Sequence, residues 1–234
     1  MRVVGIDTST FTGGIALIDN GQIVSEFNAY ITRRNSEGLM GVLDRMLKDL
    51  DWNTKDLEGI AVSVGPGSFT GTRIGVTMAK VLGYSLNIPI SAVITLDAVA
   101  ANVPFMKIPV CPLICARRNI VYNAVYNIDG SDIQRAAEYS VGKIDEVINN
   151  IKEKGYIYNS EDCKIMFLGD GAVRHKQFIQ ENLMEQAVIG PPWYLGPKPS
   201  VVAIMGQSKI NAGDITDPRD LVPFYMGKSS AEGT

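Results

Sequence analysis

The sequence has little histidine, little cysteine and almost no net charge. Its 234 residues include one histidine and three cysteines, and the net charge is −3 at pH 7. A single histidine excludes a His-x-x-x-His metal pair, and the balanced charge provides no basic field that would hold RNA or DNA unaided. Cys111 and Cys115 form the only close cysteine pair, and Cys163 is distant. We therefore predict buried thiols and no metal site.

Long hydrophobic runs are also absent, because no stretch of 18 or more apolar residues occurs. Asp7 would interrupt the apolar core of any N-terminal signal segment. These features predict a cytoplasmic protein without a membrane segment. The length suits one large domain or two of about 110 to 120 residues each.

What the sequence does contain is an alternation of strand and helix patterns. The first half predicts the order βββαβαβα, with a hairpin at Asp19-Asn20-Gly21 and helices at about 36–50 and 71–86. The second half restarts more faintly, with a helix near 143–153 and another near 173–184. A strand followed by Gly-x-Gly and a helix occurs as "SVGPG" and again as "FLGDG". This repetition indicates two halves of related architecture, the second eroded.

The glycine-rich loop "GPGSFTGTRIG" raises the question of phosphate binding. It lacks the Lys-Ser or Lys-Thr pair of a P-loop, and its glycines do not have the dinucleotide-binding spacing. Two interpretations remain open, a weak anion-binding loop and a plain connection from strand to helix. The residues of a weak nucleotide or anion loop would be Asp7, Thr8, Gly65, Gly67 and Ser68.

Four segments together resemble one protein family over nearly the whole chain. They are "GIDTST", "VSVGPGSFTGTRIGVTMAKVLG", "CARRNIVYNAVYN" and "FLGDGA", and they resemble the bacterial TsaB (YeaZ) family. The resemblance implies an α/β fold of two RNase H-like subdomains of the actin/Hsp70/sugar-kinase (ASKHA) superfamily, the second degenerate. We place the subdomains at 1–103 and 104–234, with a helix near 199–211 that can pack back on the first.

The resemblance also implies a function. TsaB proteins are non-catalytic subunits of the machinery that installs threonylcarbamoyladenosine next to the anticodon of certain tRNAs. A TsaD-like catalytic subunit and a TsaE-like ATPase would be the partners, and tRNA would be met only through the complex. The catalytic relative carries metal-binding histidines on its first helix, whereas this chain has Asn35 and Ser36 there and no histidine before His175. We therefore expect no catalytic residues, no strongly bound cofactor, and ATP or ADP only at the junction of the complex.

Two helices have apolar faces wider than one sheet requires. At 100° per residue the apolar arcs of the helices at 36–50 and 71–86 span roughly 160° and 220°, against the ~100° that covers a sheet. The second helix also repeats small residues at Gly71, Gly75, Ala79 and Gly83. This pattern predicts either tight packing on the chain's own sheet or a partner interface. The residues predicted for the interface are Leu39, Leu43, Met46, Gly71, Ile74, Gly75, Met78, Ala79 and Leu82.

We expect these helices to bind a TsaD-like subunit, and to form a homodimer when that partner is absent. The alternative function is that of a small ATP-binding ATPase or kinase of the same superfamily, with Asp7 and the glycine loops forming its site. A histidine pair and a phosphate-binding lysine are both missing, and this favours the interaction subunit.

Overall fold

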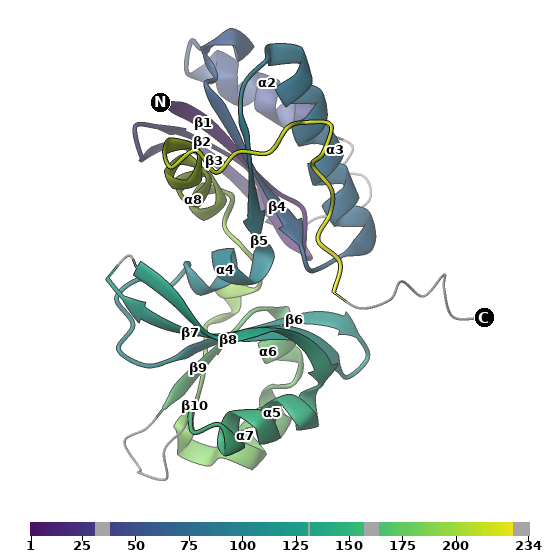
Figure 1. Ribbon diagram of the computed structural model, residues 1–234, viewed down its shortest axis with the longest axis vertical. Helices are drawn as coiled ribbons and strands as arrows, with labels where there is room; N and C mark the ends of the chain where they lie inside the picture. The colour runs from purple at the N-terminus through teal and green to yellow at the C-terminus, as the bar shows by residue number, and fades with distance from the viewer. Residues whose placement is uncertain (31–37, 131, 157–163, 227–234) are drawn as a thin grey trace, which may run out of the picture. The chain divides into compact units, whose positions relative to one another are not determined.

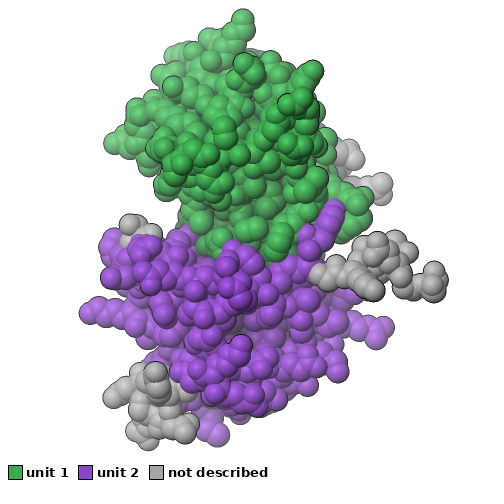
Figure 2. Space-filling view, viewed as in Figure 1, with its two compact units in different colours: residues 1–98, 197–224 green, residues 99–196, 225–234 purple. Residues whose placement is uncertain are grey.

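The computed structural model describes residues 1–30, 38–130, 132–156 and 164–226, and the chain divides into two compact units. The first unit contains residues 1–98 and 197–224, and the second contains residues 99–196 with the described residues 225 and 226 (Figure 2). Cys163 and the predicted first turn of the helix at 36–50 lie outside the described residues. Among the described residues, no helix has the length and apolar character needed to span a membrane.

The first unit contains a five-stranded sheet with the strand order β3-β2-β1-β4-β5 (Figure 1). The strands are β1 (Arg2–Asp7), β2 (Thr12–Asp19), β3 (Gln22–Tyr30), β4 (Gly59–Gly65) and β5 (Ile90–Ile94). β1, β2 and β3 are antiparallel neighbours, and the two-residue turn Asn20-Gly21 joins the last two with φ values of 49° and 81°. β4 runs parallel to β1, and β5 runs parallel to β4, because helical crossovers separate these strands in the sequence.

Helices cover both faces of this sheet. They are α2 (Leu39–Asp49), α3 (Phe69–Leu86) and α8 (Pro199–Asn211), with a short 3-10 helix at Thr54–Asp56. α2 and α3 share one apolar core with the sheet, and α8 packs on the opposite face (Figure 1). Gly206 allows α8 to approach closely, because a Cβ added there would lie 2.1 Å from the Cβ of Ala61. The helix that the sequence pattern places near 199–211 thus packs on the first sheet.

The second unit repeats the topology of the first. Its sheet has the order β10-β9-β6-β7-β8, and its strands are β6 (Val110–Arg117), β7 (Ile120–Asp129), β8 (Asp132–Lys143), β9 (Ile165–Leu168) and β10 (Ala187–Ile189). Read from β8, the order and directions match those of the first sheet read from β3. The duplication predicted from the sequence is therefore a duplication of strand order and direction.

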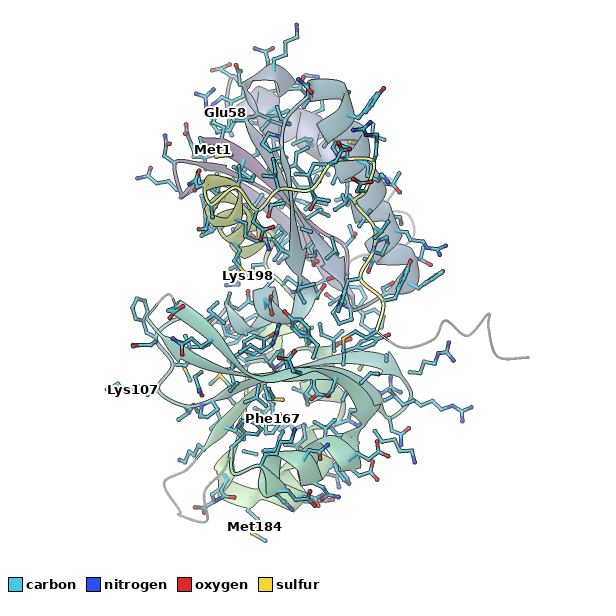
Figure 3. All side chains as sticks on the ribbon, in the orientation of Figure 1. Met1, Glu58, Lys107, Phe167, Met184 and Lys198 are labelled. Carbon is cyan, nitrogen blue, oxygen red and sulfur yellow. The ribbon has the colours of Figure 1, made fainter. Side chains whose placement is uncertain are left out.

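The helices of the second half are shorter than those of the first. They are α4 (Thr95–Ala100), which joins the halves, α5 (Ile144–Glu153), α6 (Asp170–Arg174) and α7 (Lys176–Leu183), with 3-10 helices at Met184–Gln186 and Pro192–Tyr194. The counterpart of α3 is broken at His175 into α6 and α7, and β10 has only three residues. Phe167 of β9 is fully buried in the core that α5 covers (Figure 3). The second half is thus the degenerate copy.

Candidate functional site

The loop between β4 and α3 is ordered by its own hydrogen bonds. Gly65 has a φ of 111°, which favours glycine. Ser68 caps α3, since its Oγ accepts a 3.1 Å hydrogen bond from the Gly71 amide and its carbonyl oxygen accepts one of 2.9 Å from the Thr72 amide. The amides of Gly71 and Thr72 at the start of the helix therefore already have partners within the protein.

The other glycines of this loop allow close contact with the segment that follows β1. A Cβ added at Gly67 would lie 2.1 Å from the carbonyl oxygen of Ser9, and one added at Gly71 would lie 2.0 Å from that of Thr8. The Ser68 amide donates to the Ser9 carbonyl oxygen at 2.7 Å, and Thr8 Oγ1 donates to the Gly71 carbonyl oxygen at 2.6 Å. The glycines are thus needed because the backbone of residues 8–9 lies directly against the loop.

The second half uses the same arrangement in its Gly-Asp-Gly loop. Cβ atoms added at Gly169 and Gly171 would lie 2.4 and 2.8 Å from the carbonyl oxygen of Leu113 in β6. The Asp170 carboxylate accepts a 2.9 Å hydrogen bond from the Cys115 amide. In both halves, glycines at the start of a helix let it pack against the backbone at the end of the neighbouring strand. This contact explains why the Gly-x-Gly pattern repeats.

Asp7 lies at the end of β1 and is completely buried. Its Oδ1 accepts hydrogen bonds from the amide and hydroxyl of Ser9, at 3.2 and 2.6 Å. The Ser63 hydroxyl is close enough to lower the pKa of the carboxyl, but neither Ser63 Oγ nor Asp7 Oδ2 has a hydrogen-bond partner of ordinary geometry among the described residues. Burial raises the pKa of Asp7 to about 6, and the bonds from Ser9 oppose this rise.

Of the five residues predicted for a weak anion loop, four are buried. These are Asp7, Thr8, Gly65 and Gly67, of which the last is only partly so, whereas Ser68 is exposed. Within the described part of the chain, no group of three or more His, Cys, Asp or Glu residues is placed to hold a metal ion. The structure brings the five residues together, but it fills the space between them with the chain's own hydrogen bonds.

The single histidine and the two described cysteines are not arranged for catalysis. His175, predicted to be a solvated helix residue, is half-buried, and burial lowers its pKa. Cys111 is fully buried, and burial together with Asp170 raises the pKa of Cys115 to about 11. A thiol with so high a pKa carries little thiolate at neutral pH and is a poor nucleophile.

The small-residue stripe of α3 faces the chain's own sheet. Cβ atoms added at Gly75 and Gly83 would lie 2.5 Å from Thr8 Oγ1 and 2.6 Å from Ile90 Cδ1. Eight of the nine residues predicted for the partner interface are buried, and Ile74 is half-buried; the buried ones are Leu39, Leu43, Met46, Gly71, Gly75, Met78, Ala79 and Leu82. The expectation of a partner contact at these side chains is corrected accordingly, because they form the core under α2 and α3.

The outer faces of these two helices expose other large apolar side chains. Val81 and Tyr84 of α3 are 58% and 77% exposed, and Met40 of α2 is 47% exposed. Phe69 is also exposed at the start of α3, where the Arg73 guanidinium lies 3.7 Å above its ring. The projection that identified a wide apolar arc included Val81, but it could not show which part of the arc the sheet covers.

The C-terminal segment also holds α3, and the sequence pattern gave no signal for this contact. Lys80 Nζ donates to the carbonyl oxygens of Arg219 and Leu221 at 3.1 and 3.2 Å, and the Phe224 amide donates to the Val64 carbonyl oxygen at 2.7 Å. Leu221 is buried in the core that α2 and α3 share with the sheet. This segment runs alongside α3 in Figure 1.

Two sheets of one topology, each with a glycine-started helix packed on its first strand, define a protein of two RNase H-like subdomains in the ASKHA superfamily. The ROK hexokinase of Thermus thermophilus has a related fold, with a TM-score of 0.50 and 12% identity over 90% of this chain and 100% of that one. YeaZ from Pseudomonas aeruginosa is more similar, with a TM-score of 0.80 and 21% identity over 96% of this chain and 99% of that one.

Sequence comparisons identify the family. The family model described as "TsaD: tRNA N6-adenosine threonylcarbamoyltransferase" matches residues 26–233. A Bacillus subtilis protein called "tRNA threonylcarbamoyladenosine biosynthesis protein TsaB" is 35% identical over 232 residues, covering 99% of this chain and 96% of its own length. The chain belongs to the TsaB (YeaZ) family of tRNA threonylcarbamoyladenosine biosynthesis proteins.

Proposed function

We propose that this chain is a non-catalytic subunit that binds a TsaD-like catalytic protein in the threonylcarbamoyladenosine modification of tRNA next to the anticodon. Membership in the TsaB family supports the pathway. The observation that supports partner binding is the outer face of α3, where Val81 and Tyr84 are exposed beside the buried glycine stripe. Large apolar and aromatic side chains of this kind commonly form the centre of protein interfaces.

The non-catalytic role is supported by the chemistry of the described residues. The loop that would face a nucleotide is hydrogen-bonded to Thr8 and Ser9, and Asp7 is sealed from solvent. His175 is half-buried in the second unit and cannot supply the histidine pair of the catalytic relative. These contacts argue against the alternative of a small ATPase or kinase.

The proposal includes a TsaE-like ATPase as a further partner, tRNA binding only through the assembled complex, and no tightly bound cofactor in the isolated chain. An adenine nucleotide would bind only where this subunit meets its partner. The net charge of −3 supports weak, salt-dependent tRNA binding by the chain alone.

The test measures binding to a TsaD-like subunit and the modification of tRNA by the reconstituted complex. Val81→Lys and Tyr84→Lys place charges on the outer face of α3, and each should raise the dissociation constant for the partner at least tenfold. Val173→Lys, at a comparably exposed position of the second unit, is the matched control and should bind normally. All three variants should unfold cooperatively, because each replaces an exposed side chain.

Reconstituted modification should require this subunit, and the isolated chain should show no threonylcarbamoyl transfer. Normal partner binding by both α3 variants would show that the interface lies elsewhere. Transfer or ATP hydrolysis by the purified chain alone would refute the non-catalytic role.

A further inference from the structure

The two sheets have four edge strands, and three of them are protected from pairing with another chain. Protection normally comes from short length, charged side chains or a covering segment. β10 has only three residues, and β8 carries Asp132, Arg135, Glu138 and Lys143 along its length. β5 is covered, since the Thr216 amide donates to the Ile90 carbonyl oxygen at 2.8 Å.

The fourth edge strand, β3, is different. It has nine residues, and Glu26 is its only charged one. A register shift opposite Leu17 and Ile18 leaves Val24 without a partner on β2, so the regular part runs from Ser25 to Tyr30. Among the described residues, no segment pairs with its outer edge. A long, almost uncharged and uncovered edge is a template for another strand.

The exposed side chains along this edge are mostly apolar. Phe27 is 36% exposed and Tyr30 is 61% exposed, and Phe11 stacks on Tyr30 with ring centres 6.1 Å apart. Ile23 and Val24 are exposed as well. Together these five side chains expose on the order of 500 Å², so two copies would bury about 1,000 Å², near the lower limit for a specific interface.

We infer that β3 pairs with β3 of a second copy of this chain, antiparallel and about a two-fold axis at Phe27. Residues that face one another across such a pair must point to the same side of the joined sheet, which restricts the axis to a residue position of the regular part. With the axis at Phe27, the two Phe27 rings meet, Ser25 lies opposite Ala29, and Glu26 lies opposite Asn28. No like charges are opposed.

The pair of Glu26 and Asn28 gives this register its specificity. Glu26 Oε1 already accepts hydrogen bonds from the amide and hydroxyl of Ser200, at 2.9 and 2.8 Å, which holds the side chain on the α8 face. Its Oε2 remains for the Asn28 side-chain amide of the second copy. The same bond occurs twice because the contact is symmetric. The interface leaves the outer face of α3 uncovered.

Sedimentation of the full chain over about 1 to 200 μM tests the inference, since a weak symmetric dimer dissociates within this range. The wild type should form a dimer. Asn28→Glu opposes two carboxylates and should raise the dissociation constant at least tenfold, whereas Asn28→Arg adds two ion pairs and should lower it several-fold. Gln134→Glu, the same change on the edge strand β8, is the control and should have no effect.

The register has its own test by disulfide formation. Ser25→Cys combined with Ala29→Cys should oxidise to a covalent dimer, and Ser25→Cys alone should not, because only the combination opposes two thiols. A monomeric wild type at 200 μM would overturn the inference. So would a dimer that ignores both Asn28 changes, or one dissolved by Tyr84→Lys on α3. Failure of partner binding would leave these results unchanged, because the two surfaces are separate.

Discussion

Thr8 Oγ1 donates a 2.6 Å hydrogen bond to the carbonyl oxygen of Gly71, and this bond fastens the start of α3 to the end of β1. The contact is possible only because residue 71 has no side chain, as an added Cβ would lie 2.0 Å from the Thr8 carbonyl oxygen. The glycine-rich loop therefore positions α3. The position of α3 in turn decides which of its side chains face outward.

We predict that Gly71→Ala destabilises the protein by about 2–4 kcal/mol, because the backbone of Thr8 must move to admit the methyl group. Gly41→Ala is the matched control, since a Cβ there meets nothing within 4 Å. It removes a glycine from the interior of α2 and should stabilise by up to ~1 kcal/mol. Urea unfolding of both variants measures the difference. Equal stabilities would contradict the close contact.

Asp7 predicts a particular dependence of stability on pH. Its pKa is about 6 in the folded protein and 3.8 as the ordinary value, so between these pH values the folded state binds the extra proton. Stability from this group is fully present below pH 3.8 and is lost as pH rises through 6. The loss amounts to about 3 kcal/mol.

Asp7→Asn removes this titration and keeps a side chain of the same shape. The difference in unfolding free energy between wild type and variant should therefore change by about 3 kcal/mol from pH 4 to pH 7.5, with the variant favoured at the higher pH. Denaturant unfolding across this range measures it. A constant difference would mean that Asp7 titrates normally.

The C-terminal segment should contribute to stability through Leu221. Leu221→Ala leaves a cavity in the shared core of α2, α3 and the sheet, and we expect a loss of about 2–4 kcal/mol. Its neighbour Val222 is exposed, so Val222→Ala should change stability by less than ~0.5 kcal/mol. Similar effects of the two substitutions would show that the segment does not pack in solution as it does here.

Adenine nucleotides should bind the isolated chain weakly. The amides of Ser68, Gly71 and Thr72 already donate to protein oxygens, so few donors remain for a phosphate. Calorimetric titration with ATP, with and without magnesium, should give a dissociation constant no tighter than about 1 mM. Micromolar binding that is lost in Asp7→Asn would support the ATPase alternative instead.

Local signals in the sequence determined much of the fold. The Asn20-Gly21 turn requires positive φ, and it predicts the β2–β3 hairpin that is found. The two Gly-x-Gly segments predict a duplication, because each marks the passage from a buried strand to a helix. The motif block around residues 62–83 identified the family, which the comparisons confirm. These features depend on residues near one another in the chain.

The tertiary structure alone decided which side of α3 is exposed. A helical projection groups Met78, Leu82 and Val81 in one apolar arc, but the sheet buries the first two and leaves the third in solvent. The same holds for Asp7, whose burial depends on segments distant in sequence, and for Lys80, whose partners lie about 140 residues away. Sequence periodicity reports how much apolar surface a helix has. Only the packing of distant segments determines how much of that surface the protein itself covers.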